Sequence, residues 1–316
     1  MRYIFIVNSY AGPINAEKEI VPNLLSQMKK LNLKYEVYKT NYSAHATKIA
    51  KKIAESKENI TIFSCGGDGT LNEIIEGVYG YNNVSVACVP CGTGNDFIRN
   101  FTNDEKLFLN VENYINGNTI DIDLIEVNGK IAVSICSVGL DAKVAFNVSK
   151  FKRVKFLSGS GAYIASLLSC LIKPLGCKVK IIIDDIMKIE NILLLSIANG
   201  GFYGGGFNSA PLADMCDSVI DLVTVKKISR FKIASIINYY KKGTHFSGNE
   251  VNEKFKDIIT YQKVKKVVIK TNKKMYMNVD GECIETDKVE AKILPKAVKI
   301  LLPNGVNGMC KVEENK

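Results

Sequence analysis

Two glycine-rich turns, each placed after a short apolar run, carry the residues best suited to chemistry. The first reads Gly-Gly-Asp-Gly-Thr-Leu-Asn at 66–72 and follows the apolar run 60–65. Glycine lets the backbone approach a phosphate closely, and the N-terminus of a following helix adds partial positive charge. Because Asp68 would repel a bare phosphate, we expect it beside a Mg²⁺ that arrives with a nucleotide. The pattern predicts a nucleotide site, and an ordinary strand–turn–helix connection is the alternative.

The second turn reads Pro-Cys-Gly-Thr-Gly-Asn-Asp-Phe at 90–97 and follows the strand-like run 84–89. Two strands that each end in such a loop fit adjacent parallel strands of an α/β sheet. Ligands bind these sheets at the carboxyl ends of the strands, so we expect both turns to serve one site.

Together the two turns resemble those of the diacylglycerol kinase/sphingosine kinase-like lipid kinase family, specifically its bacterial soluble branch. The first turn alone is shared with NAD kinases and 6-phosphofructokinases. The stretch Gly-Thr-Gly-Asn-Asp-Phe at 92–97 is much more specific to the lipid kinases. The resemblance implies a fold of class α/β plus β. An N-terminal doubly wound α/β nucleotide-binding domain, of the NAD kinase/diacylglycerol kinase type, would precede a C-terminal antiparallel β-sandwich-like domain.

The hydrophobic periodicity of the chain favours the same division. Up to about residue 121, apolar runs alternate with amphipathic windows, which predicts strands at 3–7, 35–39, 60–64 and 84–89 and helices at 20–31, 44–56 and 71–79. Beyond 124, only two helical windows, 158–172 and 230–242, interrupt strand signals at 131–138, 178–184, 192–198, 219–225, 264–270, 275–279, 289–293 and 298–302. We therefore expect a nucleotide-binding domain at 1–123, completed by 296–316, and a β-rich lipid-acceptor domain at 124–295.

A third candidate loop, Asn-Ser-Tyr-Ala-Gly at 8–12, follows the first strand. It matches the phosphate loop Asn-Pro-x-Ser-Gly of the family at its first and last residues, while Ser9 replaces the proline, Ala11 replaces the serine and Pro13 stands where a basic residue often follows. An ordinary strand-to-helix turn is the alternative. The resemblance assigns nucleotide binding to Asn8, Ser9, Tyr10, Ala11, Gly12, Thr40, Gly66, Gly67, Asp68, Gly69, Thr70, Leu71, Asn72, Thr93, Asn95 and Asp96.

Acidic residues late in the chain are candidates for proton transfer. Asp280-Gly281 lies between two alternating runs, which by itself predicts a two-residue type I′ hairpin. The family places its acid/base machinery on this turn, so either Asp280 or Glu282 would accept the proton of the attacking lipid hydroxyl. Asp121 and Asp123 share one side of an alternating stretch, and the resemblance assigns Asp123 to the phosphoryl-transfer site with Asp68.

A second metal site follows from the resemblance alone. Asp217 would hold a structural Mg²⁺ together with the backbone carbonyls of Asp214 and Val219. Cys216 and Ser218 replace the usual Asp/Asn and Gly neighbours. Because serine lacks the conformational freedom of glycine, the substitution puts the direction of those carbonyls in question.

The composition points to anionic partners. The net charge is +10, and lysines cluster at 150–155, 226–227, 263–266 and 270–274. We expect peripheral contact with an anionic membrane surface, with solvated lysine-rich faces as the alternative. The basic, partly apolar segment 150–172 is the candidate membrane-facing element, although an ordinary packed helix is the simpler interpretation.

The remaining features indicate a soluble cytoplasmic protein, which acts at most at the inner face of the membrane. No apolar run reaches the roughly 18 residues that a membrane span needs. The nine cysteines lie mostly in apolar stretches and predict free thiols in a reducing compartment. No stretch is typical of nucleic-acid binding. The sequence leaves the oligomeric state open, a homodimer included.

The function that combines these features is an ATP- and Mg²⁺-dependent lipid kinase that phosphorylates a hydroxyl of diacylglycerol or a related lipid. One alternative is an NAD kinase-like enzyme that uses the same Gly-Gly-Asp-Gly turn. The other is a catalytically weak, membrane-associated lipid-binding protein with the same fold.

Overall fold

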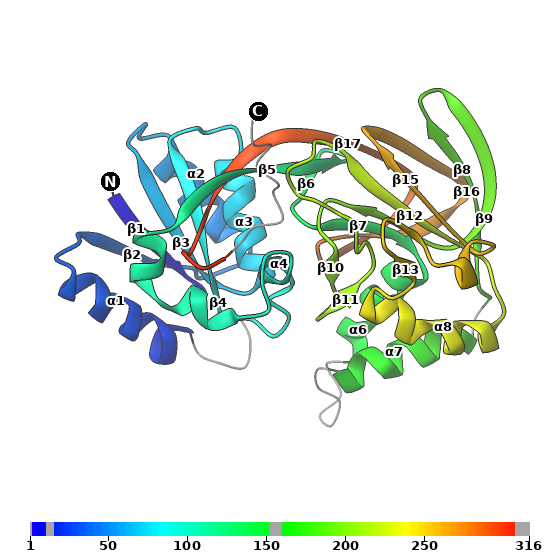
Figure 1. Cartoon of the computed structure of the whole chain (residues 1–316), viewed down its shortest axis with the longest axis horizontal. Helices are drawn as coiled ribbons and strands as arrows, with labels where there is room; N and C mark the ends of the chain where they lie inside the picture. The colour runs from blue at the N-terminus through cyan, green and yellow to red at the C-terminus, as the bar shows by residue number, and fades with distance from the viewer. Residues whose placement is uncertain (1, 11–15, 152–159, 173, 307–316) are drawn as a thin grey trace. The chain divides into compact units, whose positions relative to one another are not determined.

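The computed structural model describes residues 2–10, 16–151, 160–172 and 174–306 (Figure 1). The chain forms two compact units. Unit 1 comprises Met1–Leu124, Met215–Asp217 and Pro295–Lys316, and unit 2 comprises Ile125–Asp214 and Ser218–Leu294. Two long strands, β5 (Asn118–Val127) and β17 (Glu282–Leu302), contribute residues to both units.

Unit 1 is built on a parallel sheet whose strands are β1 (Arg2–Val7), β2 (Tyr35–Lys39), β3 (Ile60–Gly66), β4 (Val84–Pro90) and the last part of β17. Their order is β17-β4-β3-β1-β2, and every neighbouring pair is parallel. All seven residues of β3 are buried, as expected for a central strand that is covered on both faces. The parallel arrangement brings the carboxyl ends of β1, β3 and β4 to one edge.

The helical elements of unit 1 are the π-helix η1 (Ala16–Ile20), α1 (Val21–Lys30), α2 (His45–Ala54), α3 (Asp68–Val78), α4 (Asp96–Arg99), the 3₁₀ turn η2 (Glu105–Leu109) and α5 (Val111–Ile115). Helix α1 packs on α5, and α2 packs on α3. Figure 1 shows these two pairs on opposite sides of the sheet. The approach of α2 to α3 depends on Gly77, because a Cβ there would lie 3.0 Å from the Cβ of Ala50. The fold of unit 1 is therefore the doubly wound α/β arrangement that the sequence predicts.

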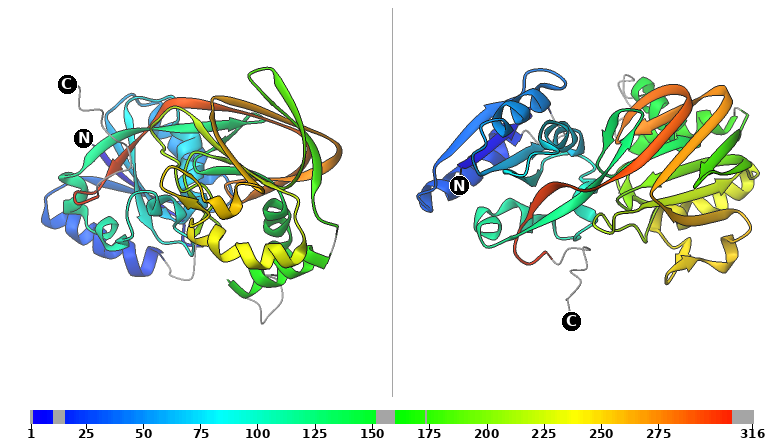
Figure 2. Two further views of the ribbon diagram at one scale, coloured as in Figure 1. Left: turned by 45° about the vertical axis from the view of Figure 1, so that its right-hand side comes forward. Right: turned by 90° about the horizontal axis from the view of Figure 1, so that it is seen from above.

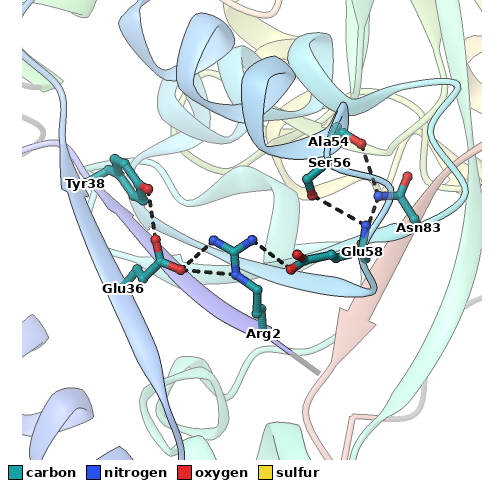
Figure 3. A network of polar contacts seen from close by, with 7 residues as sticks. All are labelled: Arg2, Glu36, Tyr38, Ala54, Ser56, Glu58 and Asn83. Carbon is teal, nitrogen blue, oxygen red and sulfur yellow. Dashed lines mark hydrogen bonds and ion pairs between the residues drawn. The ribbon is translucent and has the colours of Figure 1, made fainter.

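A polar network ties together the amino ends of this sheet (Figure 3). The guanidinium of Arg2 donates to the Glu36 carboxylate at 2.5 and 3.1 Å and to Glu58 at 2.8 Å. Asn83 Nδ2 donates to the backbone carbonyls of Ala54 and Glu58. Surface ion pairs of this kind are worth at most about 1 kcal/mol each, so their main effect is to fix the register at the edge opposite the glycine-rich turns.

Unit 2 is antiparallel and β-rich. Its main strands are β6 (Lys130–Ala132), β7 (Ile135–Gly139), β8 (Cys177–Ile183), β9 (Ile186–Ala198), β12 (Ile220–Lys226), β15 (Ile259–Val264), β16 (Lys266–Val279) and the first part of β17. Two short hairpins, one 3₁₀ turn and three helices complete it: β10 (Phe202–Tyr203), β11 (Phe207–Asn208), β13 (Phe246–Ser247), β14 (Glu250–Val251), η3 (Glu253–Phe255), α6 (Leu140–Phe151), α7 (Ser160–Ile172) and α8 (Arg230–Lys242).

Two hydrophobic cores stabilise unit 2. One lies among the strands and includes Ile181, Leu195 and Val267. The other joins the helices to the sheet, with Val144 of α6 and Ile233 of α8 among its members. Figure 2 shows the three helices gathered on one side of the sheet. Among the residues that the structure describes, no helix is long and apolar enough to cross a membrane.

The largest departures from the predicted elements concern strand length and one helix. Strands expected at 264–270 and 275–279 are a single strand, β16, and β17 likewise joins two predicted strands. The strand expected at 131–138 is instead broken at 133–134. Helix α6 was not predicted, because the β-branched Val144 and Val148 favour strands locally. Packing of α6 into the helical core overrides that preference.

Candidate functional site

The three loops at the carboxyl edge of the unit 1 sheet are hydrogen-bonded to one another. Asn8, directly after β1, donates its backbone N–H to the Cys65 carbonyl at 3.0 Å and its Nδ2 to Thr70 Oγ1 at 3.0 Å. The loop after β4 joins them, because the Cys91 N–H donates to the Gly66 carbonyl at 2.9 Å. Loops that are separate in sequence thus form one polar surface.

Glycine is required where the loop at 66–72 meets the loop at 90–97. A Cβ built on Gly92 would lie 2.6 Å from the Cα of Gly67. Real Cβ atoms essentially never show a separation this short. At Gly69, by contrast, nothing lies within 4 Å of the Cβ position. Gly67 immediately precedes α3 and has extended geometry, with φ −92°. The start of α3 therefore lies beside backbone that carries no side chain at Gly67 and Gly92, which suits the close approach of an anion to a helix N-terminus.

Two carboxylates lie beside this surface. The Cβ position of Gly94 is 3.1 Å from Asp68 Oδ2 and 3.3 Å from Asp96 Oδ2, so both acids face the same small space. Asp68 is fixed there because its Oδ1 accepts the N–H of Phe97 at 3.1 Å. Asp96 is 8% exposed and lies 3.7 Å from the Arg99 guanidinium. Carboxylate oxygens in a space that only glycine leaves open match the ligand preference of Mg²⁺.

The other residues expected to bind nucleotide differ in what they can offer. Asn95 is in the left-handed conformation, with φ 49°, and its Oδ1 accepts the Gly92 N–H at 3.0 Å, so it shapes the loop. Thr93 is exposed and Asn72 is half-buried. Leu71 is 1% exposed and belongs to the core, so only its backbone can contribute to binding.

The loop at 8–12 is described only in part. Ser9 donates to the Glu17 carboxylate at 2.6 Å, and Glu17 also pairs with Lys39. The Tyr10 ring is 85% exposed. Thr40, after β2, is buried and donates its N–H to the Val7 carbonyl at 2.9 Å. Ala11 and Gly12, which were expected to contact phosphate, lie outside the described residues.

Asp123 connects three segments of unit 1. It is fully buried, its N–H donates to the Met215 carbonyl at 2.7 Å, and its Oδ1 accepts the Lys296 N–H at 2.7 Å. Asp121, two residues away on β5, is exposed. These contacts give Asp123 a clear structural role, because it holds residues 215 and 296 against β5.

The Asp280-Gly281 turn forms as predicted. Both residues have positive φ, 44° and 99°, and Val279 pairs with Glu282 across the turn. The Asp280 carboxylate accepts four hydrogen bonds of 2.5–3.3 Å from the consecutive N–H groups of residues 133–135. Those three donors explain the break between β6 and β7. No pattern in the sequence indicated these hydrogen bonds, because the accepting Asp280 lies about 145 residues after the donors.

Glu282 has a different environment on the same hairpin. Its side chain is 72% exposed and pairs with Lys130 at 2.6 Å. Asp280 is thus held firmly by backbone donors, whereas Glu282 lies at the surface and can rearrange.

In the segment expected to bind a structural metal, the backbone at Ser218 has the conformation that glycine favours. Ser218 has φ 61°, in the left-handed region that glycine favours, so the serine has not removed that geometry. Asp214, Asp217 and Val219 are half-buried. Within the described ranges, no group of three or more His, Cys, Asp or Glu side chains could hold a metal ion. The expected site uses one carboxylate and two backbone carbonyls, so it is a different arrangement.

The cysteines are mostly free, as expected. Cys88 and Cys91, which have the spacing of a redox pair, are free and buried, and burial raises the pKa of the Cys91 thiol to about 12. Such a thiol stays protonated and unreactive at neutral pH. Cys216 is disulfide-bonded, so the prediction of a free thiol is wrong at that position.

One buried acid was missed by the sequence reasoning. Asp141, near the start of α6, is 4% exposed, and burial raises its pKa from 3.8 to about 6. It faces an apolar pocket that also includes Leu194 and Tyr240. A single aspartate at the start of an unpredicted helix gave no signal that could have identified it.

Comparisons with known proteins agree with this architecture. Residues 2–127 match the diacylglycerol kinase catalytic domain, and residues 134–302 match the YegS C-terminal NAD kinase beta sandwich-like domain. The chain is 28% identical to "Putative lipid kinase SERP0390" of Staphylococcus epidermidis, over 91% of each chain. It is 26% identical to a protein of Staphylococcus carnosus named "Diacylglycerol kinase", over 84% of this chain and 83% of the other.

A solved structure has the same fold. It is that of a "putative diacylglycerol kinase" from Bacillus anthracis, with a TM-score of 0.74 and 22% identity, and the match covers 96% of this chain and 98% of the other. Both family matches and the two-part fold confirm the resemblance drawn from the two glycine-rich turns. The chain belongs to the diacylglycerol kinase-like family of lipid kinases.

Proposed function

We propose that this protein transfers the γ-phosphate of ATP, with Mg²⁺, to a hydroxyl of diacylglycerol or a related lipid. The observation that carries the proposal is the junction of three strand-end loops beside the Asp68 and Asp96 carboxylates. Phosphoryl transfer needs mainly positioning and charge neutralisation, and this surface offers backbone donors and metal ligands together.

Backbone groups would hold the phosphates. The N–H groups of Asp68 and Gly69, at the start of α3, have no helical carbonyl to bond, whereas those of Thr70 and Leu71 donate to the Gly67 carbonyl. The Gly67–Gly92 contact keeps side chains away from that turn. Asn8 and Asn95 fix the neighbouring loops through their side-chain hydrogen bonds. The remaining residues assigned to the nucleotide would contact it through exposed groups such as Thr93.

The acids fit a divalent cation. Asp68 and Asp96 would hold Mg²⁺ in the space above Gly94, where both carboxylates already converge. When bound, the ion would neutralise charge on the phosphates. Asp123 would support this region indirectly, because it fixes the segment around residue 296.

The acidic turn would activate the acceptor hydroxyl. The contacts favour Glu282 as the proton acceptor, because four hydrogen bonds already occupy the Asp280 carboxylate. Donors of this kind stabilise the ionised carboxylate and make it a weaker base. We therefore propose Asp280 as a positioning residue that fixes the turn on which Glu282 stands.

Two further assignments belong to the same proposal. Asp217 would hold a structural Mg²⁺ with the carbonyls of Asp214 and Val219, supported by the left-handed Ser218. The enzyme would work from the cytoplasm, in peripheral contact with the membrane that contains its lipid substrate. The net charge of +10 supports that contact.

One assay tests the proposal. Purified protein is incubated with ATP and Mg²⁺ in separate reactions with micellar diacylglycerol, sphingosine, phosphatidylglycerol or NAD, and the products are identified by mass spectrometry. A phosphorylated lipid is the expected product. Phosphorylated NAD alone would overturn the lipid assignment. No product with any acceptor, from protein that still binds ATP, would favour a lipid-binding protein over an enzyme.

A further inference from the structure

Unit 2 contains an open pocket of about 690 Å³ that is lined by an unusual number of lysines. We call it the lysine pocket. Its walls come mainly from β8, β9 and β16, and its lysines are Lys143, Lys178, Lys180, Lys227, Lys270, Lys273 and Lys274. No aspartate or glutamate lines it among the described residues. None of these lysines takes part in the nucleotide site proposed above.

The strand register places like charges directly opposite one another. Lys180 on β8 is the cross-strand partner of Lys270 on β16. Directly opposed like charges destabilise a sheet. Just beyond Lys270 the pairing of β16 with β17 shifts, so that residues 271–274 bulge from the strand. The bulge is fastened to β8, because Thr271 Oγ1 donates to the Lys178 carbonyl at 3.2 Å.

Six other lysines of unit 2 are paired with glutamates. Lys130, Lys188, Lys256, Lys266, Lys288 and Lys292 each lie within ion-pair distance of a glutamate. Within the described part of the chain, no ion pair involves a lysine of the lysine pocket. A concave surface with several uncompensated positive charges is complementary to phosphate-bearing anions.

Exposed apolar side chains border the same charges. Ile189 on β9 lies opposite Lys180, lines the lysine pocket and is 52% exposed. Met187, two residues away on the same face, is 56% exposed. Lysines beside exposed aliphatic side chains are typical of surfaces that lie at the headgroup region of an anionic bilayer. A soluble polyanion would not need the aliphatic border.

We propose that the lysine pocket binds the phosphate headgroup of an anionic phospholipid in a bilayer. Ile189 and Met187 enter the interface beside it. The site is distinct from the segment 150–172 that the sequence suggested as a membrane-facing element. It does not depend on the catalytic assignment, and its test needs no turnover.

The test measures flotation of the full chain with vesicles. Wild-type protein should bind vesicles that contain equal parts of phosphatidylglycerol and phosphatidylcholine, and should not bind vesicles of phosphatidylcholine alone. Lys180→Gln/Lys270→Gln should lower the partition coefficient roughly 30-fold, which corresponds to about 1 kcal/mol for each lysine. The matched control Lys242→Gln/Lys254→Gln removes the same charge from exposed positions outside the pocket. It should lower the partition coefficient less than 3-fold, which is well below the roughly 30-fold loss expected for the pocket variant.

Three results would overturn the proposal. Equal losses in the pocket variant and the control would show general charge attraction. Wild-type binding by the pocket variant would exclude these lysines. Competition of vesicle binding by micromolar inorganic pyrophosphate, together with unchanged binding in Ile189→Ser/Met187→Ser, would identify a soluble anion as the ligand. Thermal unfolding of each variant excludes misfolding, because removing opposed charges should not destabilise the sheet.

Discussion

The contact between Gly67 and Gly92 gives the sharpest test of the loop geometry. In Gly92→Ala the new Cβ would lie 2.6 Å from Gly67 Cα and 3.0 Å from Asn95 Oδ1. Carbon atoms in favourable contact are about 3.5–4.0 Å apart. One of the two loops must therefore move by about 1 Å, and the loops are held together by backbone hydrogen bonds that resist the movement.

The expected effects follow from that displacement. Overpacking of this kind costs about 1–3 kcal/mol of folding free energy. A misplacement of about 1 Å in a positioning loop costs about 100-fold in rate. We therefore expect Gly92→Ala to lower kcat/KM for ATP about 100-fold and to weaken ATP binding in calorimetry, while urea denaturation shows reduced stability of unit 1.

Gly69→Ala is the matched control for stability. Nothing lies within 4 Å of its Cβ position, and it lies in the first turn of α3. Alanine is favoured over glycine in a helix by about 0.5–1 kcal/mol, so this variant should be as stable as wild type or slightly more stable. If Gly92→Ala binds ATP and unfolds like the wild type, the close approach of the two loops is not what shapes the site.

Three further predictions concern the acids. Asp68→Asn should abolish the Mg²⁺ dependence of ATP binding in calorimetric titrations without a change in circular dichroism, and an unchanged Mg²⁺ dependence would exclude Asp68 as a metal ligand. Glu282→Gln should lower kcat by 10²–10⁴-fold at unchanged stability. Asp280→Asn should destabilise the protein by about 1–3 kcal/mol, because one of the two accepting oxygens becomes an NH₂ group that faces the N–H donors of residues 133–135. The reverse pattern would make Asp280 the base. Burial raises the pKa of Asp141 to about 6 from 3.8, so the contribution of Asp141 to the stability of unit 2 should be fully present below about pH 4 and should be lost as the pH rises through 6, by about 3 kcal/mol at most. Asp141→Asn should flatten that part of the urea-denaturation profile, and an unchanged profile would refute the assignment.

Local patterns predicted much of unit 1 and some elements of unit 2. The strand–turn–helix around residue 66 and the type I′ turn at 280–281 depend on neighbours in sequence, so glycine and aspartate at fixed offsets were sufficient. Helix α8 was predicted with its observed limits, 230–242. The family could be recognised from the two glycine-rich turns, because their residue types are constrained by close backbone contacts such as Gly67 with Gly92.

Contacts between distant segments could not be predicted in this way. The N–H groups of residues 133–135 meet Asp280 about 145 residues later, and no local pattern reveals which acceptor they find. The lysine pocket also depends on contacts between segments that are distant in sequence. Lys270, Lys273 and Lys274 formed a visible cluster in the sequence, but Lys180 joins them only through strand pairing.

Hydrogen exchange of the full chain, with and without ATP and Mg²⁺, tests the central claim most directly. We predict that nucleotide slows amide exchange together in residues 8–10, 66–72 and 92–96, with smaller changes elsewhere in unit 1. Protection confined to one of these loops, or located in unit 2 alone, would contradict the claim that three strand-end loops form a single triphosphate site.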